Sequence, residues 1–448
     1  MDSSLAEVDQ ELFDLIEKEK YRQLSTIELI PSENFTSRAV MDCLGSCLAN
    51  QYTESISYRR YYGETRVDPI QNLCQTRALK AYRLDKNEWG VIVESYSGSL
   101  ANFQIFATLL KPHDKIMGLN ITAGGHLSHG CIIPKKTNQK VVFYESVSYG
   151  LDPSTGTVDY DNLEKTARLI CPKIIIAGAS AYPRDYDYGR FKAISKEVGA
   201  IFMVDMAHYC GLVSSQLVND PFLHADIVTT TTYKTMRGPR GALIFYRKSF
   251  EEKVSTMISP SIQGGGHNNS IAGIATQLRE LETNEYKDYS RKVIENCKII
   301  GETLIGLGYT LLSGGTDTHL LLWDLRPQGL TGNKMEKICE AAKINVSKYA
   351  VPGDTSSLIL GGIRIGSPAM TTRGATSEDF KKIAHFLHRA LNIALEIQAD
   401  PMIGPNDFDN AVAQNPKVQQ LKDQVHDFSI QFRMPGTDVL FMRNANLE

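Results

Sequence analysis

Short apolar runs alternate with longer amphipathic stretches through the first half of the chain. The apolar runs lie at residues 91–93, 115–119, 173–177, 200–205, 227–228 and 242–246. Runs of this length are typical of buried strands, and the stretches between them have helical spacing. This alternation predicts an α/β fold with a mostly parallel sheet.

A long helical pattern follows from Leu278 to Leu307 and leads to further apolar runs at 319–323 and 363–365. We place a domain boundary near residue 285. The sequence therefore predicts an N-terminal helical arm over residues 1–30, a large domain over 31–285 and a smaller α/β domain over 286–448. The arm repeats apolar residues at helical spacing, so it packs either on another subunit or on its own domain.

Composition excludes several classes of protein. A chain of 448 residues with 42% hydrophobic and 22% charged residues is typical of a folded globular protein with more than one domain. A formal net charge of −3 gives no reason to expect nucleic acid or an anionic membrane as a partner. The eight cysteines form no C-x-x-C pair, which favours reduced thiols over disulfides or a metal site. The acidic N-terminus resembles neither a signal nor a transit peptide, so we expect a cytoplasmic protein.

One lysine carries the clearest chemical signal. Lys234 follows the run Thr229–Thr232. An earlier apolar run, residues 200–205, ends in Asp205, with His208 close behind. A lysine at a strand end can hold an aldehyde cofactor as a Schiff base, and an aspartate there can keep a pyridine nitrogen protonated. Together they indicate pyridoxal 5'-phosphate (PLP). Each alone is more often a solvated loop lysine or a helix cap.

Several further motifs match one family in order and spacing. They are Glu28–Ser37, Arg60–Gly63, Ser97–Ser99, Gly124–Gly130, Asp205–His208, the Lys234 segment, Gln263–Gly265 and Gly362–Ala369. On these residues the chain resembles the serine hydroxymethyltransferases of eukaryotic type, as a divergent member. The resemblance implies a PLP-dependent transferase of fold type I with a seven-stranded sheet in the large domain. It also implies the interconversion of serine plus tetrahydrofolate with glycine plus 5,10-methylenetetrahydrofolate.

The cofactor residues follow partly from chemistry and partly from the resemblance. Ser97, Gly98 and Ser99 lie between a predicted strand and a predicted helix, where unpaired N–H groups suit a phosphate dianion. The resemblance adds His126 stacked on the cofactor ring and Ser180 and His208 near the ring hydroxyl. It also implies that Gly264 and Gly265 contact the phosphate of a neighbouring chain, so we expect a homodimer or homotetramer.

The substrate residues are expected at both ends of the chain. Arg364, at the end of a predicted strand, can bind an amino-acid carboxylate through two parallel hydrogen bonds. By resemblance Glu54 moves a proton during the reaction, and Thr231 is a further candidate catalytic residue. The resemblance also places three residues near the substrate: Ser32, Tyr52 and Tyr62.

Some positions depart from the family pattern. Tyr233 replaces the histidine before the lysine, Tyr349 replaces an asparagine that contacts folate, and Glu64 and Gly266 replace a glycine and a proline. An unsatisfied buried polar partner costs about 1–3 kcal/mol, so folate affinity is expected to suffer most. We expect Tyr349 to lie away from Arg364, so that Tyr349→Asn tightens folate without changing the affinity for glycine.

Three functions therefore compete at this stage. The first is an active serine hydroxymethyltransferase, with activity reduced by these departures. The second is a PLP-binding paralogue with impaired folate use, acting as an aldolase on 3-hydroxy amino acids or as a non-catalytic partner subunit. The third is an unrelated fold or binding module.

Overall fold

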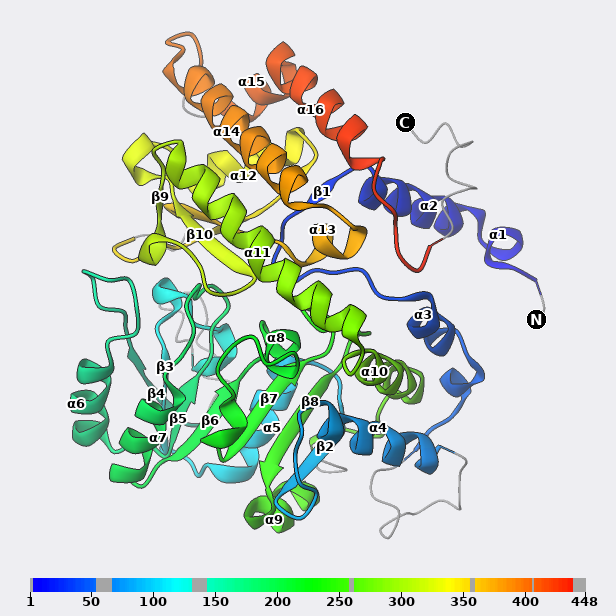
Figure 1. Ribbon diagram of the computed structural model, residues 1–448, viewed down its shortest axis with the longest axis vertical. Helices are drawn as coiled ribbons and strands as arrows, with labels where there is room; N and C mark the ends of the chain where they lie inside the picture. The colour runs from blue at the N-terminus through cyan, green and yellow to red at the C-terminus, as the bar shows by residue number, and fades with distance from the viewer. Residues whose placement is uncertain are drawn as a thin grey trace.

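The computed structural model describes residues 3–53, 67–130, 143–257, 262–354, 359–404 and 407–437. Glu54, Tyr62 and Glu64 lie outside these described residues. Figure 1 shows a larger body around a wide sheet and a second body around a smaller sheet, with helix α11 running from one to the other. The predicted α/β class is confirmed.

The large sheet has seven strands in the order β2-β8-β7-β6-β5-β3-β4. All are parallel except β8, which runs antiparallel between β2 and β7. The strands are β2 (Trp89–Ser95), β3 (Lys115–Leu119), β4 (Glu145–Tyr149), β5 (Ile174–Ala177), β6 (Ile201–Asp205), β7 (Ile227–Thr231) and β8 (Ala242–Arg247). The mostly parallel seven-stranded sheet is therefore confirmed, and each predicted strand is present.

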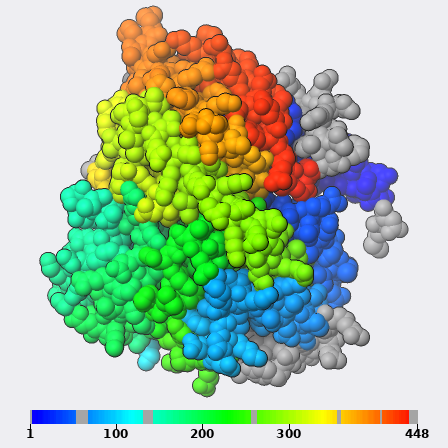
Figure 2. Space-filling view, in the orientation of Figure 1, coloured from blue at the N-terminus to red at the C-terminus, as the bar shows by residue number. Residues whose placement is uncertain are grey.

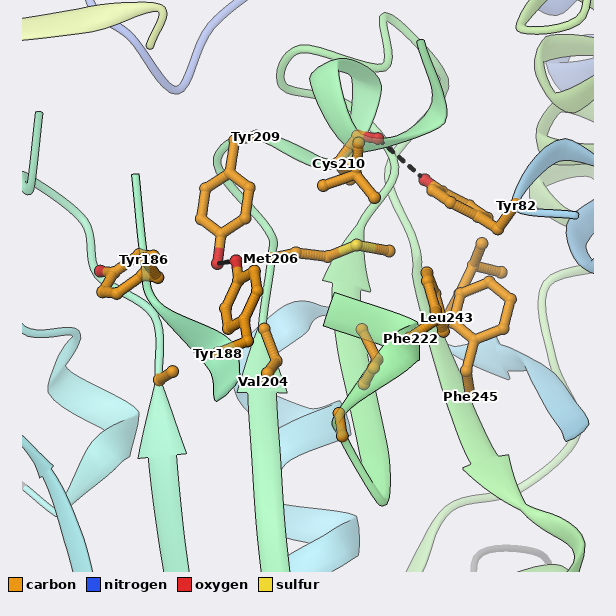
Figure 3. Packing of buried hydrophobic residues seen from close by; sticks show 14 of the residues in the cluster. Tyr82, Tyr186, Tyr188, Val204, Met206, Tyr209, Cys210, Phe222, Leu243 and Phe245 are labelled. Carbon is orange, nitrogen blue, oxygen red and sulfur yellow. Dashed lines mark hydrogen bonds between the residues drawn. The ribbon is translucent and has the colours of Figure 1, made fainter. Parts of the chain in front are cut away.

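Burial on both faces explains why these strands are so apolar. Every residue of β5 and β7 is buried, as expected for parallel strands covered by helices on both sides. Figure 3 shows part of one face, where the Tyr188 hydroxyl donates to that of Tyr209 (3.0 Å) and the Tyr82 hydroxyl donates to the Cys210 carbonyl (3.3 Å). Edge strand β4 is mainly polar and partly exposed, so no apolar run predicted it.

Helices cover both faces of this sheet, and several begin at side chains that accept a hydrogen bond from a backbone N–H. Asp159 caps α6 in this way, and Asp187 caps α7. The helices of this body are α3 (Arg38–Leu44), α4 (Asp68–Ala81), α5 (Gly98–Leu109), α6 (Tyr160–Ile170), α7 (Tyr188–Glu197), α8 (Cys210–Ser214), α9 (Glu251–Met257) and α10 (Asn268–Glu280).

The second body contains an antiparallel sheet in the order β12-β13-β10-β9. Its strands are β9 (Thr310–Leu311), β10 (Leu320–Asp324), β12 (Ser347–Tyr349) and β13 (Gly362–Gly366). Its helices are α12 (Gly332–Ala341), α13 (Pro368–Arg373), α14 (Ser377–Ala399), α15 (Phe408–Gln414) and α16 (Pro416–Ser429). The predicted strands correspond to β10 and β13. The sequence did not predict β12, a short strand without an apolar run.

The predicted long helix is two helices, α10 and α11 (Asn284–Gly306), because Thr283 starts a new helix by accepting from the Tyr286 N–H (3.2 Å). The first turns of α11, including Tyr286, pack in the core of the large body. Its later turns, from Cys297 onward, pack in the core of the second body. The expected boundary near residue 285 lies at the start of a helix that belongs to both cores.

The N-terminal segment forms α1 (Leu5–Val8) and α2 (Gln10–Leu24), so its predicted helix is confirmed. Figure 2 shows the start of this segment projecting from the edge of the body. Leu12 and Leu15 expose 45% and 56% of their surface, which leaves apolar area uncovered within this chain. Strand β1 (Ile27–Glu28) then pairs with β11 (Ile344–Asn345) and joins the segment to the second body. Among the described residues, no helix has a length and hydropathy that suit a membrane crossing. Every described cysteine is a free thiol.

A buried arginine ties the N-terminal segment to the second body. Arg373 ends α13 and is 1% exposed. Its guanidinium donates to the carbonyls of Leu24 (2.7 Å), Thr26 (3.0 Å) and Ser429 (2.7 Å), near the ends of α2 and α16. Burial lowers its pKa to about 10, with a partial offset from the Glu28 charge, so it remains charged at neutral pH.

We predict that Arg373→Met lowers the free energy of unfolding by about 3–5 kcal/mol, because several buried carbonyls lose a charged donor. Urea unfolding followed by circular dichroism measures this change. Arg291→Met is the matched control, since Arg291 pairs with Asp288 while 55% of its side chain is exposed. Equal unfolding midpoints for the two variants would contradict a structural role of Arg373.

Candidate active site

The predicted site residues meet at the carboxyl ends of β6 and β7. A buried cavity of about 60 Å³ is lined by Ser97, Gly98, Ser99, His126, Ser180, Asp205, His208, Thr231 and Lys234. Asp205 is the last residue of β6, and Thr231 is the last residue of β7. Ligand sites in open α/β sheets usually lie at this edge. A larger adjoining cavity of about 850 Å³ extends from His126 and Lys234 to Ser32, Tyr349 and Arg364.

The start of α5 forms one wall of the small cavity. Ser97 caps the helix, since its hydroxyl accepts from the Leu100 N–H (3.3 Å). A side chain at Gly98 would place its Cβ 2.7 Å from Cγ2 of Thr231, so only glycine allows this helix start to approach β7 so closely. The expected position of these residues between a strand and a helix N-terminus is confirmed. This wall is suited to a phosphate dianion.

Asp205, at the end of β6, places a carboxylate in the wall of the same cavity. One carboxylate oxygen accepts from the Asn102 amide (2.8 Å) and lies 2.9 Å from Nε2 of His129, and the other accepts from the Ala207 N–H (3.0 Å). Thr229 donates to the Asn102 carbonyl oxygen (2.7 Å), which fixes the amide orientation. Burial raises the pKa of Asp205, but the hydrogen bond and charge of His129 outweigh this, so the pKa lies below its usual range. Asp205 is therefore a buried carboxylate that stays ionised.

Burial has the opposite effect on the basic groups of the cavity. Desolvation lowers the pKa of Lys234 to about 8 and that of His126 to about 4. It also holds the pKa of His208 well below its usual range. Both histidines are thus neutral at physiological pH, and the Lys234 amine reaches its neutral, nucleophilic form near pH 8.

Arg364 lies in the larger cavity and comes from β13 of the second body. Its Nη1 donates to the Ser180 carbonyl (2.7 Å), and its Nη2 donates to Oγ of Ser347 (3.2 Å). Its guanidinium also lies over the ring of Tyr349, with Cζ 5.2 Å from the ring centroid. The expectation that Tyr349 lies away from Arg364 is therefore wrong, because β12 and β13 are paired and place the two side chains together.

Three of the predicted site residues that the structure describes line neither the small nor the larger cavity. Gly265 lies against Thr53, where an added Cβ would be 1.7 Å from the Thr53 carbonyl oxygen, and its own carbonyl accepts from the Tyr96 hydroxyl (2.7 Å). Gly264 lies nearest the hydroxyls of Tyr52 and Tyr96. Tyr52 is 59% exposed. The expected contacts of Glu54 and Tyr62 lie outside the described residues.

The structure adds three residues to which the sequence gave no role. Asn102 and His129 hold Asp205, and His319 places Nε2 3.3 Å from Nδ1 of His208. The sequence could have indicated Asn102, because it is a polar residue within the apolar first half of α5. It could also have indicated His129, which lies within the motif Gly124–Gly130. His126, His129 and Asp205 also bring possible metal-ligand atoms within 4.8 Å of one another.

Comparison with known proteins agrees with this arrangement. The family model described as serine hydroxymethyltransferase matches residues 5–387. The chain belongs to the serine hydroxymethyltransferase family. It is 49% identical to serine hydroxymethyltransferase 3, chloroplastic, of Arabidopsis thaliana, over 97% of this chain and 85% of that protein. It is 45% identical to the cytosolic serine hydroxymethyltransferase of Oryctolagus cuniculus, over 96% of this chain and 94% of that protein. The hypothesis of an unrelated fold is excluded.

Serine hydroxymethyltransferases use PLP and tetrahydrofolate. The donors present here fit PLP. The α5 N-terminus suits its phosphate, the ionised Asp205 suits a protonated ring nitrogen, and the neutral His126 suits a ring face. The α5 N-terminus, Asp205 and His126 line one cavity with Lys234, whose amine suits the aldehyde group of PLP.

We predict that PLP incorporation into the apo-protein accelerates as pH rises, with a midpoint at about pH 8. The lowered pKa of Lys234 means that the neutral amine predominates above this pH. Initial rates of borohydride-trapped incorporation measure the midpoint, and Lys234→Ala supplies the background from other lysines. A rate that still rises toward pH about 10.4, the ordinary lysine value, would contradict the assignment.

Proposed function

We propose that this protein transfers the hydroxymethyl carbon of serine to tetrahydrofolate, giving glycine and 5,10-methylenetetrahydrofolate, and catalyses the reverse reaction. The observation that carries this proposal is the shared cavity of Lys234, Asp205 and the α5 N-terminus, which opens toward Arg364. Relatives named serine hydroxymethyltransferase at 45–49% identity over nearly the whole chain support the same activity.

Bound PLP would supply an electron sink for the pair released when a bond at the substrate α-carbon breaks. Asp205, ionised and held by Asn102 and His129, would keep a proton on the ring nitrogen. Lys234 would hold the aldehyde, and its amine, which becomes neutral near pH 8, could accept or return a proton at the substrate. Neutral His126 would line the cofactor site without adding charge. Ser180 and His208 line the same cavity, where they would lie near the ring hydroxyl.

Arg364 is the residue that would bind the carboxylate of the amino-acid substrate. Its Nη1 and Nη2 atoms each use one N–H in the bonds to Ser180 and Ser347, so each retains a second N–H for a carboxylate. Ser32 lines the same cavity and can assist. Thr231, buried beside Lys234, donates to the Ala207 carbonyl (3.2 Å), which makes it a residue that shapes the cavity wall. The proposed proton-transfer role of Glu54 and the substrate contact of Tyr62 rest on the family resemblance.

The alternative of a paralogue with impaired folate use is not favoured by the comparisons, because relatives of this identity carry the name of the enzyme. The relatives do not agree on a cellular compartment, since one is named as chloroplastic and another as cytosolic. We propose the cytoplasm, since one of these relatives is named as cytosolic. We also propose a homodimer or homotetramer, in which Gly264, Gly265 and Tyr52 serve the neighbouring chain.

We predict that Lys234→Ala abolishes the visible absorbance of lysine-bound PLP, its fixation by borohydride and serine turnover with tetrahydrofolate. The wild-type protein should respond spectrally to glycine and again when a reduced folate is added. Peptide mapping after borohydride treatment identifies the labelled residue. Label on another lysine would refute the site. A wild-type protein that binds glycine but never turns over serine with folate would refute the reaction.

We predict that the PLP-loaded protein sediments as a dimer or larger at micromolar concentration. A sharper test mixes two inactive variants, Lys234→Ala and Tyr52→Ala. If Tyr52 serves the neighbouring site, mixed dimers contain one site with both wild-type residues and regain part of the activity. Mixing Lys234→Ala with Asp205→Ala is the control, because both residues belong to one cavity of one chain and cannot complement. A monomer, or equal activity in both mixtures, would contradict the proposal.

A further inference from the structure

The pairing of β12 and β13 brings three side chains to one face of the second sheet. Ser347 is directly opposite Arg364, and Tyr349 is opposite Gly362. Residues two apart on a strand face the same side, so Ser347 and Tyr349 both lie on the side of Arg364. The Tyr349 ring lies beside the guanidinium, with its centroid 5.2 Å from Cζ of Arg364.

Arg364 is held by two hydrogen bonds and lies next to an aromatic ring. Its Nη1 and Nη2 donate to the Ser180 carbonyl and to Oγ of Ser347, and its Cζ lies over the Tyr349 ring, 5.2 Å from the centroid. The Ser180 side chain lies near the Tyr349 phenol and lowers its pKa, although burial raises that pKa overall. Ser180 thus accepts a hydrogen bond from the guanidinium and lies beside the neighbouring ring.

The charge of Arg364 has little other compensation within the described residues. The side chain is 8% exposed, and none of the described carboxylates forms an ion pair with it. Burial lowers its pKa. An aromatic ring next to a guanidinium stabilises the cation without using its N–H groups, which stay available to a ligand.

We propose that Tyr349 is a positioning residue for Arg364, and that it thereby sets the affinity for the carboxylate of the amino-acid substrate. The inference deepens the proposed function and rests on it. Tyr349 and Arg364 line the same 850 Å³ cavity, so the position expected to affect folate also acts on the amino-acid end. A role confined to folate would leave glycine binding unchanged when the residue is altered.

The test compares PLP-loaded wild type, Tyr349→Leu and Tyr349→Phe by spectral titration with glycine and with glycinamide, which lacks the carboxylate. Tyr349→Leu removes the aromatic face and should weaken glycine about tenfold. Tyr349→Phe keeps the aromatic ring and removes only the hydroxyl that lies near Ser180, so a smaller loss of about threefold is expected. The glycinamide constant should be unchanged in both variants.

Tyr21→Leu is the matched control, because Tyr21 lies under the Lys343 amine at 5.5 Å and lines neither of these two cavities. It should bind glycine as the wild type does. PLP content and near-ultraviolet circular dichroism confirm that each variant is folded and loaded.

Equal glycine constants for wild type and Tyr349→Leu would overturn the inference, as would a parallel loss of glycine and glycinamide, which indicates general damage to the site. A wild-type protein without any response to glycine would overturn both this inference and the proposed function. If the glycine constant depends on Tyr349 as expected but the wild-type protein lacks folate-dependent turnover, the proposed function alone would be overturned.

Discussion

The chemistry of this site depends on keeping one buried carboxylate ionised. Asp205 is 7% exposed, and an uncompensated charge at such a position would normally take up a proton. The fold opposes this with donors from separate elements: Asn102 from α5, the His129 ring and the backbone N–H of Ala207. The same carboxylate raises the pKa of Lys234, so without it the amine would titrate still lower. The two groups therefore have to be buried together.

The second constraint is that Arg364, the cation proposed to bind the substrate, comes from a different body. Lys234 follows β7 of the parallel sheet, whereas Arg364 belongs to β13 of the antiparallel sheet. The Nη1 bond from Arg364 to the Ser180 carbonyl joins the two sheets at the cavity itself. Helix α11 packs in both cores. Arg373, at the end of α13, donates hydrogen bonds to carbonyls at the ends of α2 and α16. The relative position of Lys234 and Arg364 thus depends on contacts far from either residue.

Sequence patterns predicted most of the large sheet because its central strands are buried on both faces and read as continuous apolar runs. They missed β4 and β12, whose residues are polar or partly exposed. The motifs predicted Lys234, Asp205 and Arg364 as site residues, because few other residue types can form a Schiff base, pair with a protonated ring nitrogen or bind a carboxylate through two hydrogen bonds. They did not reveal Asn102 or His319, whose roles depend on which elements pack together, nor the register that pairs Ser347 with Arg364.

The two tyrosines that depart from the family pattern have a common physical consequence. Tyr233 lies under Arg240 at 4.1 Å, and Tyr349 lies under Arg364 at 5.2 Å, on the wall of one cavity. An acidic partner would neutralise either guanidinium but would compete with a substrate carboxylate for its N–H groups. An aromatic face stabilises the cation while leaving those donors free. Both substitutions therefore retain the positive charge of the cavity, which is compatible with an active enzyme whose affinity for carboxylate ligands is set by aromatic contacts.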